Sequence, residues 1–303
     1  MPHTIPISPN GDLNPITAVA PSGGDVLPPV ELYSSHYLRY NGPIGRLGAN
    51  QTTHTAEVNF PGGPGLAVVK AFSLKEKGWV NEALAWALGN ALDVGVPPKA
   101  MLLAASASDL ASSKDPELSL ASSLWGHAGP IMLWCASRLE IKMPQQVWPI
   151  GWERIVTSKP FGRRLAAFDA WLGNCDRIAQ NAPYWLAKGR IAAIDHERLA
   201  FNQDWRYMAP IHRDKVDGSI THLMKAIRES ITRKKIKSSD AKSLIADLAL
   251  LSDEHSAALS VVQVLSEQLV IDNFGKNAST CLHAFLADRA SREFIDERLE
   301  QLR

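Results

Sequence analysis

The feature that most constrains this 303-residue chain is a polar loop followed by a short hairpin, between residues 174 and 196. The loop reads Asn-Cys-Asp-Arg-Ile-Ala-Gln-Asn, so that Asp176 is followed five positions later by Asn181. A β-hairpin is expected next, and its second strand ends in Ile-Asp-His, with Asp195 as the acid. These three side chains work together only in a fold that brings the end of the hairpin back to the loop.

The residue types of this segment suit phosphoryl transfer from a nucleotide. Asp176 would accept the proton of an attacking hydroxyl, and Asn181 and Asp195 would bind the Mg²⁺ that bridges the phosphates of ATP. The protein then mainly positions the reacting groups and neutralises their charge. An Asp that caps a turn is the alternative for Asp176, because Asp is common in loops. The spacing alone is a weak signal, and its weight comes from the segments around it.

Two charged residues upstream predict an ion pair. Lys70 lies within the apolar run 67–72, and a lysine is rarely buried without a partner. Glu82 lies on a helix expected over residues 75–92, opposite the apolar stripe of that helix. We expect Glu82 to hold the ammonium of Lys70, which would contact the α- and β-phosphates of ATP. A solvent-exposed lysine and a solvated surface Glu are the alternatives.

Together these segments resemble the HipA-like kinases and, more distantly, the phosphatidylinositol 3/4-kinases. The matching parts are the apolar helix 164–173, the loop NCDRIAQN, the strand 190–196 and the upstream Val-Val-Lys and Asn-Glu segments. They occur in the family's order between residues 31 and 201. The resemblance implies a two-lobed protein-kinase-like α+β fold, with a small antiparallel sheet lobe and a larger, mostly helical lobe.

The same resemblance divides the chain into three parts. A proline-rich, irregular arm (1–29) precedes a kinase N-lobe (30–141) and a helical C-lobe (142–303). The hinge between the lobes would follow an apolar strand, so that the backbone near Ser137 and Leu139 would meet adenine.

A glycine-rich turn stands where the family has a phosphate-covering loop. It contains Gly45 and Gly48, whose freed backbone N–H groups would cradle phosphate oxygens. Its G-x-x-G-x-x-G spacing departs from the usual kinase pattern, and a structural β-turn is the alternative. Arg177 is expected to support the catalytic loop by pairing with a carboxylate or a carbonyl, and Asp169 is a candidate partner.

Periodicity and turn residues predict the remaining elements. Strands are expected at 31–34, 54–60, 66–72, 101–104 and 130–135, and helices at 222–232, 239–251, 256–270 and 281–302. The stretch 106–123, rich in Ser, Ala and Asp, is predicted to be a loop.

The resemblance implies an ATP- and Mg²⁺-dependent phosphotransferase that transfers the γ-phosphoryl group to the hydroxyl of a protein Ser or Thr. A small-molecule or lipid kinase is the alternative among enzymes. A catalytically inactive pseudokinase that serves as an interaction module is the alternative outside them. Some members of the family are toxins or are held by a partner, so a protein substrate and a regulatory or antitoxin protein are the implied partners.

Composition excludes several other classes. A net charge of +1 gives no global attraction to nucleic acid or to anionic lipid. The basic run 228–237 is interpreted as a solvated helix face or helix end, and nucleic acid or a phosphorylated partner is the alternative. Three cysteines at wide, odd spacing favour neither a disulfide framework nor a zinc site. No stretch is long and apolar enough to span a membrane, and the first 28 residues do not resemble a signal peptide. A cytoplasmic location is therefore expected.

Overall fold

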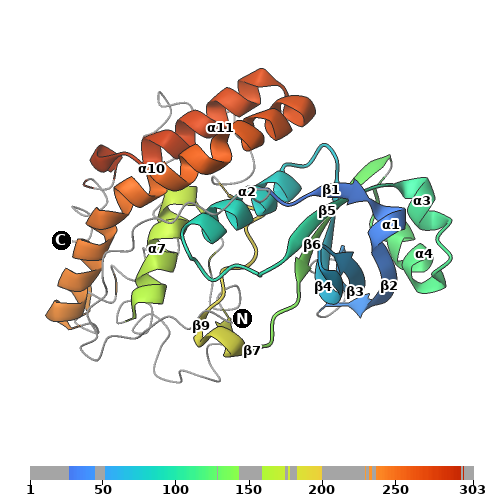
Figure 1. Ribbon diagram of the computed structural model, residues 1–303, viewed down its shortest axis with the longest axis horizontal. Helices are drawn as coiled ribbons and strands as arrows, with labels where there is room; N and C mark the ends of the chain where they lie inside the picture. Colours follow the sequence, from blue (N-terminus) through green and yellow to red (C-terminus); the bar gives the residue numbers. More distant parts are fainter. Residues whose placement is uncertain are drawn as a thin grey trace.

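The computed structural model places a β-sheet at one end of the molecule and a group of helices at the other (Figure 1). It describes residues 27–44, 52–127, 129–142, 159–174, 177, 183–199, 229, 232–233, 237–294 and 296. The strands are β1 (Val30–Leu32), β2 (Tyr37–Pro43), β3 (Thr53–Phe60), β4 (Gly63–Ser73), β5 (Ala100–Ser106), β6 (Pro130–Ser137), β7 (Ile141–Lys142), β8 (Tyr184–Trp185) and β9 (Arg190–Ile191). The helices are α1 (Tyr33–His36), α2 (Gly78–Ala91), α3 (Ala107–Ala111), α4 (Pro116–Ser123), α7 (Pro160–Leu172), α10 (Ser238–Phe274), α11 (Lys276–Arg289) and the 3₁₀ turn η2 (Leu186–Lys188).

The larger sheet has the strand order β1-β5-β6-β4-β3-β2. The predicted α+β class, with a sheet part and a mostly helical part, is confirmed, but the prediction that this sheet is antiparallel is wrong in one respect. Strand β1 pairs parallel to β5, whereas the other neighbours are antiparallel, so the sheet is mixed. The difference arises because the one-turn helix α1 carries the chain from β1 at one edge of the sheet to β2 at the other.

Two hydrophobic cores cover the two faces of this sheet. Successive side chains of a strand point to opposite faces. Along β4, Ala67, Val69 and Ala71 enter the core shared with α3 and α4, whereas Val68 and Lys70 face α2. Helix α2 is buried on almost every side, because it lies between the sheet and α10 (Figure 1).

The segment predicted to be a loop at 106–123 instead forms the two helices α3 and α4. Its polar residues are helix caps: Ser106 and Asp109 form a capping box, and the carboxylate of Asp115 accepts the N–H groups that open α4. Leu110 and Leu118 anchor the two helices in the core. Ser and Asp favour caps as strongly as turns, and composition alone does not separate the two.

The helical part differs from the prediction in the lengths of its elements. The two helices predicted at 239–251 and 256–270 form the single helix α10, because the residues between them include neither Gly nor Pro. Helix α11 begins at Lys276, after Gly275, and ends at Arg289, so it starts and stops earlier than predicted. None of the described helices, α10 included, has the length and apolar character that crossing a membrane requires.

Two predicted segments lie mainly outside the described residues: the arm 1–29 and the helix 222–232. The predicted hairpin before Asp195 is present as β8 and β9, which pair antiparallel. Its second strand is shorter than the expected 190–196, since only Arg190 and Ile191 have strand structure.

The loop after α2 touches this hairpin at Gly95. The Gly95 carbonyl accepts a hydrogen bond of 2.8 Å from the N–H of Ala193, and a Cβ at Gly95 would overlap the carbonyl oxygen of Ile191. Replacing Gly95 by Ala is therefore expected to cost about 3 kcal/mol of unfolding free energy, the upper end for overpacking, because backbone must move. Urea denaturation of Gly95→Ala measures this loss. Gly65→Ala is the matched control: its Cβ would meet Phe60 at 3.5 Å, an ordinary contact, and its stability should hold.

A buried histidine between α7 and α10 makes stability depend on pH. His255 stacks on Trp171, with ring centroids 4.3 Å apart, and its Nδ1 has no hydrogen-bond partner among the described residues. Burial, with the nearby charge of Arg164, lowers the pKa of His255 to about 3. The unfolded chain takes up this proton near pH 6.5, so the stability contribution is full above that pH and falls as the pH drops toward 3.

Replacing His255 by Phe should keep the ring stacking and remove the proton uptake. We expect the unfolding free energy of His255→Phe to depend less steeply on pH between 6 and 4, by up to about 1.4 kcal/mol per pH unit. Urea denaturation at several pH values checks this. An unchanged slope would show that His255 is not the titrating group.

Candidate active site

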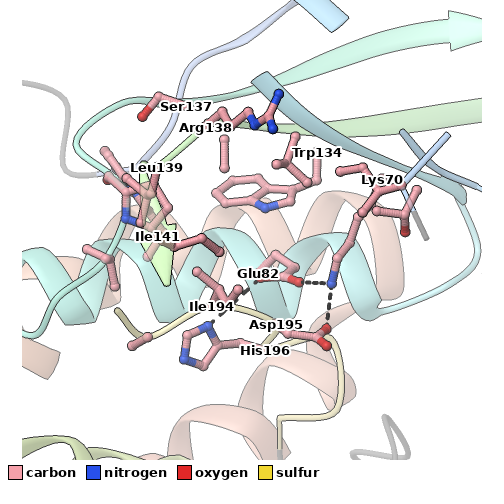
Figure 2. A pocket seen from close by; sticks show the side chains of 18 of the residues that line it. Lys70, Glu82, Trp134, Ser137, Arg138, Leu139, Ile141, Ile194, Asp195 and His196 are labelled. Carbon is pink, nitrogen blue, oxygen red and sulfur yellow. Dashed lines mark hydrogen bonds and ion pairs between the residues drawn. The ribbon is translucent and has the colours of Figure 1, made fainter. Parts of the chain in front are cut away.

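Lys70 is directed into a cavity between the sheet and α2. It stands opposite Trp134 of β6 in the register of the sheet, and both side chains line the same cavity (Figure 2). Only 12% of the Lys70 side chain is exposed, so its ammonium depends on nearby anions for compensation.

Three carboxylates surround this ammonium. The Lys70 Nζ lies 2.6 Å from Oε1 of Glu82, 2.5 Å from Oδ1 of Asp195 and 3.5 Å from Oε2 of Glu197. The predicted contact between Lys70 and Glu82 is therefore present. Burial alone would lower the pKa of Lys70, but the three carboxylates outweigh it and raise the pKa above its usual value, so the lysine is charged.

The same contacts affect the acids. Burial opposes ionisation of Asp195, but the charge of Lys70 outweighs it and lowers the pKa of Asp195 below its usual value. Glu82 is more deeply buried, and burial raises the pKa of its carboxyl group while Lys70 acts in the opposite sense. The backbone N–H of His196 also donates to the Glu82 carboxylate. Asp195 thus stays ionised more readily than Glu82.

A second buried ion pair holds the segment that leads to Asp195. Nε and Nη2 of Arg177 donate to the two oxygens of Asp169 on α7, at 2.8 and 3.1 Å. Nη1 of Arg177 donates to the carbonyl of Ile194 at 2.5 Å, so one guanidinium joins α7 to the residue before Asp195. The predicted pairing of Arg177 with a carboxylate or a carbonyl is present, and Asp169 is the carboxylate; the support of the loop itself stays a prediction, because residues 175–176 and 178–182 lie outside the described part of the chain.

His196 takes part in this support as a neutral ring. Burial, with the charges of Arg177 and Lys70, holds its pKa well below the usual value. Nη2 of Arg177 donates to Nε2 of His196 at 2.9 Å, which leaves the ring proton on Nδ1. That nitrogen lies 3.9 Å from Oε2 of Glu82, as the dashed line in Figure 2 marks.

Asp195 has an unusual backbone conformation, with a φ of 65°. Asp adopts this left-handed region more readily than most residues, but still at a cost that the surroundings must offset. The hydrogen bonds of Arg177 to the carbonyl of Ile194 and to the ring of His196, on either side of Asp195, supply that restraint.

The cavity has a volume of about 880 Å³ and a largely apolar lining. Lys70, Glu82 and Asp195 lie in one part of it, and Ser137 and Leu139, the predicted hinge residues, also line it. Its other residues are Ile44, Thr53, Thr55, Leu66, Val68, Trp86, Val96, Pro97, Trp134, Ala136, Arg138, Glu140, Ile141, Ala193, Ile194 and His196. The structure thus brings together the five predicted site residues that it describes.

Four predicted site residues lie outside the described part of the chain: Asp176, Asn181, Gly45 and Gly48. Their roles as base, metal ligand and phosphate loop stay predictions from the sequence.

Sequence reasoning missed Glu197 and the contact that Asn81 makes with it. Glu197 directly follows the Ile-Asp-His signature, but nothing in its own pattern marks it. The sequence marks Asn81 only as part of the Asn-Glu segment of the helix. Its amide reaches a residue 116 positions away in the chain, which no local signal indicates.

Comparisons with known proteins leave the family open. No protein-family model matches the chain, and no curated protein matches it. Among solved structures, the chain is similar to the crystal structure of a Helicobacter pylori proinflammatory kinase, CtkA, with 16% sequence identity and a TM-score of 0.46. The match covers 88% of this chain and 97% of that chain. These values do not assign a function, and the HipA-like family stays a prediction from the sequence.

Proposed function

We propose that the protein is a kinase that transfers the γ-phosphoryl group of ATP to a hydroxyl. The acceptor that we propose is the side chain of a protein Ser or Thr. One observation carries the proposal: a charged, buried lysine joins a helix Glu to an ionised Asp at one end of a large, mainly apolar cavity. This arrangement suits a nucleotide, because the apolar part accepts the base and the cationic part accepts the phosphates.

The hinge offers hydrogen bonds to a base. The N–H of Arg138 donates to Leu66, and the carbonyl of Glu140 accepts from Leu186. Among the described residues, neither the N–H nor the carbonyl of Leu139 between them has a backbone partner. Leu139 lines the cavity, so its backbone donor and acceptor are available for the proposed contact with the donor and acceptor edge of adenine.

The acidic residues fit a divalent cation. Oxygens of Glu82, Asp195 and Glu197 lie within 4.8 Å of one another, and carboxylates are preferred Mg²⁺ ligands. In the proposed enzyme, Asp195 and Asn181 would hold Mg²⁺, which neutralises charge on the phosphates. Lys70 would bind the α- and β-phosphates, Glu82 would hold Lys70, and Asp176 would accept the proton of the acceptor hydroxyl.

The test is transfer of label from γ-labelled ATP in the presence of Mg²⁺ to the protein itself and to a cell lysate. We expect labelled protein with the wild type and a loss of at least about 100-fold with Asp195→Asn or Asp176→Asn. Asp253→Asn, at an exposed site on α10, is the matched control and should keep full activity.

The other outcomes separate the alternatives. Label on a sugar, a polyol or an inositol lipid, with none on protein, would replace the protein kinase by a small-molecule or lipid kinase. Thermal stabilisation by ATP without transfer would indicate a pseudokinase.

A further inference from the structure

Asn81 makes a buried contact between the two parts of the molecule. It lies in the first turns of α2, its side chain is fully buried, and its Nδ2 donates to the backbone carbonyl of Glu197 at 2.8 Å. Helix α2 packs on the sheet, whereas Glu197 follows the β8–β9 hairpin. Among the described residues, Oδ1 of Asn81 has no hydrogen-bond partner. The bond to Glu197 is therefore the interaction that offsets the cost of burying this amide.

The neighbouring Glu82 holds the same segment with the opposite polarity. Its carboxylate accepts the backbone N–H of His196, whereas the amide of Asn81 donates to the carbonyl of Glu197. Two successive side chains of one helix thus bind two successive residues of one turn. Together, the donor and the acceptor restrain the position of this turn relative to α2.

The turn held in this way, residues 196–199, directly follows Asp195. The φ of 65° at Asp195 is a conformation that persists only where the surroundings restrain it. Arg177 restrains the residue before, through the carbonyl of Ile194, and Glu82 and Asn81 restrain the two residues after. Of these groups, Asn81 is uncharged and does not line the cavity.

We propose that Asn81 is a positioning residue: by holding the carbonyl of Glu197, it keeps the carboxylate of Asp195 beside Lys70, in the place from which Asp195 would also hold Mg²⁺ in the proposed enzyme. The proposal rests on the function proposed above. Asn81 does not line the cavity, so its replacement should change the metal dependence and not the nucleotide affinity itself.

The experiment compares Asn81→Leu and Asn81→Asp with the wild type. Both replacements are close in size to Asn and remove the N–H donor, and using two guards against a folding failure of one. Asn90→Leu is the matched control, because Asn90 lies on the same helix and is exposed, and its side chain donates, among the described residues, only to the carbonyl of Trp86 in that helix.

The first readout is backbone hydrogen exchange of the segment 191–199, which requires no activity. We expect the His196 amide to exchange about tenfold faster in both Asn81 variants, the effect of one lost hydrogen bond. The second readout is the Mg²⁺ concentration for half-maximal transfer. It should rise about tenfold, whereas the affinity for a metal-free, non-hydrolysable ATP analogue stays within about twofold of the wild type.

Exchange and Mg²⁺ dependence equal to those of Asn90→Leu would overturn the proposal, even if the Asn81 variants were less stable, because lower stability alone indicates a packing role. Weaker binding of the metal-free analogue, with unchanged Mg²⁺ dependence, would also overturn it. If the wild type transfers no phosphate, the proposed function fails. The exchange rates, with the effect of Mg²⁺ on binding of the analogue, then decide the role of Asn81.

Discussion

Replacing Lys70 by Met is expected to reduce phosphoryl transfer by at least about 100-fold. In the described part of the cavity, the ammonium of Lys70 faces three carboxylates. Removing one electrostatic contact of this kind from an active site lowers the rate by about 100-fold or more. Met keeps the length and apolar character of the lysine stem, so the packing of β4 against Trp134 should be retained.

The replacement should also change the sign of the pH dependence that these carboxylates give to the unfolding free energy. In the wild type, Lys70 lowers the pKa of Asp195, so this group stabilises the fold above its unfolded pKa near 4 and loses that effect as the pH falls further. Without the ammonium, the negative charges of Glu82 and Asp195 repel one another, and the pKa values of these two groups rise. The variant should therefore gain stability relative to the wild type as the pH falls from 8 toward 5.

Two measurements check this prediction. Labelled transfer gives the activity, and urea denaturation at pH 8 and pH 5 gives the difference in unfolding free energy. Mg²⁺ in the absence of nucleotide should raise the melting temperature of Lys70→Met more than that of the wild type, because the ion relieves the repulsion. Lys99→Met, an exposed lysine of the same part of the chain, is the control for both. Activity near the wild-type level would exclude Lys70 from the site.

The contacts that were predicted correctly have strong local causes. An apolar run around Lys70 requires a buried anion, and Glu82, opposite the apolar stripe of its helix, is the nearby acid that could supply it. Arg177 and Asp169 are separated by only eight positions, so a helix that ends at Gly173 returns one toward the other. Burial makes such pairs nearly obligatory, and sequence reasoning is effective where burial leaves few alternatives.

The features that were missed depend on tertiary approach. The amide of Asn81 finds the carbonyl of Glu197 only after α2 has packed against the hairpin, and a backbone carbonyl leaves no trace in the sequence. Likewise, the parallel pairing of β1 with β5 is set by where α1 carries the chain and not by the residues of β1. The serines and aspartates of α3 and α4 suit caps and loops equally, so local composition left that choice open.

Removing Asp169 should have the largest effect on stability. Its side chain and that of Arg177 have no exposed surface, and the two are joined by two hydrogen bonds. In Asp169→Leu the guanidinium stays buried without its counter-charge, which typically costs about 3–5 kcal/mol of unfolding free energy. Urea denaturation measures the loss. The exposed pair of Arg292 and Asp296 on one helical turn is the control, and Asp296→Ala should cost less than about 1 kcal/mol.

The double variant Asp169→Leu, Arg177→Met separates stability from positioning. Apolar side chains of similar size often replace a buried ion pair without loss, so much of the stability should return. Activity should not return, because the carbonyl of Ile194 and the ring of His196 have lost the guanidinium that held them beside Asp195. Recovery of both would mean that the pair only fills the core. Recovery of stability without activity would show that α7 acts on the site through Arg177.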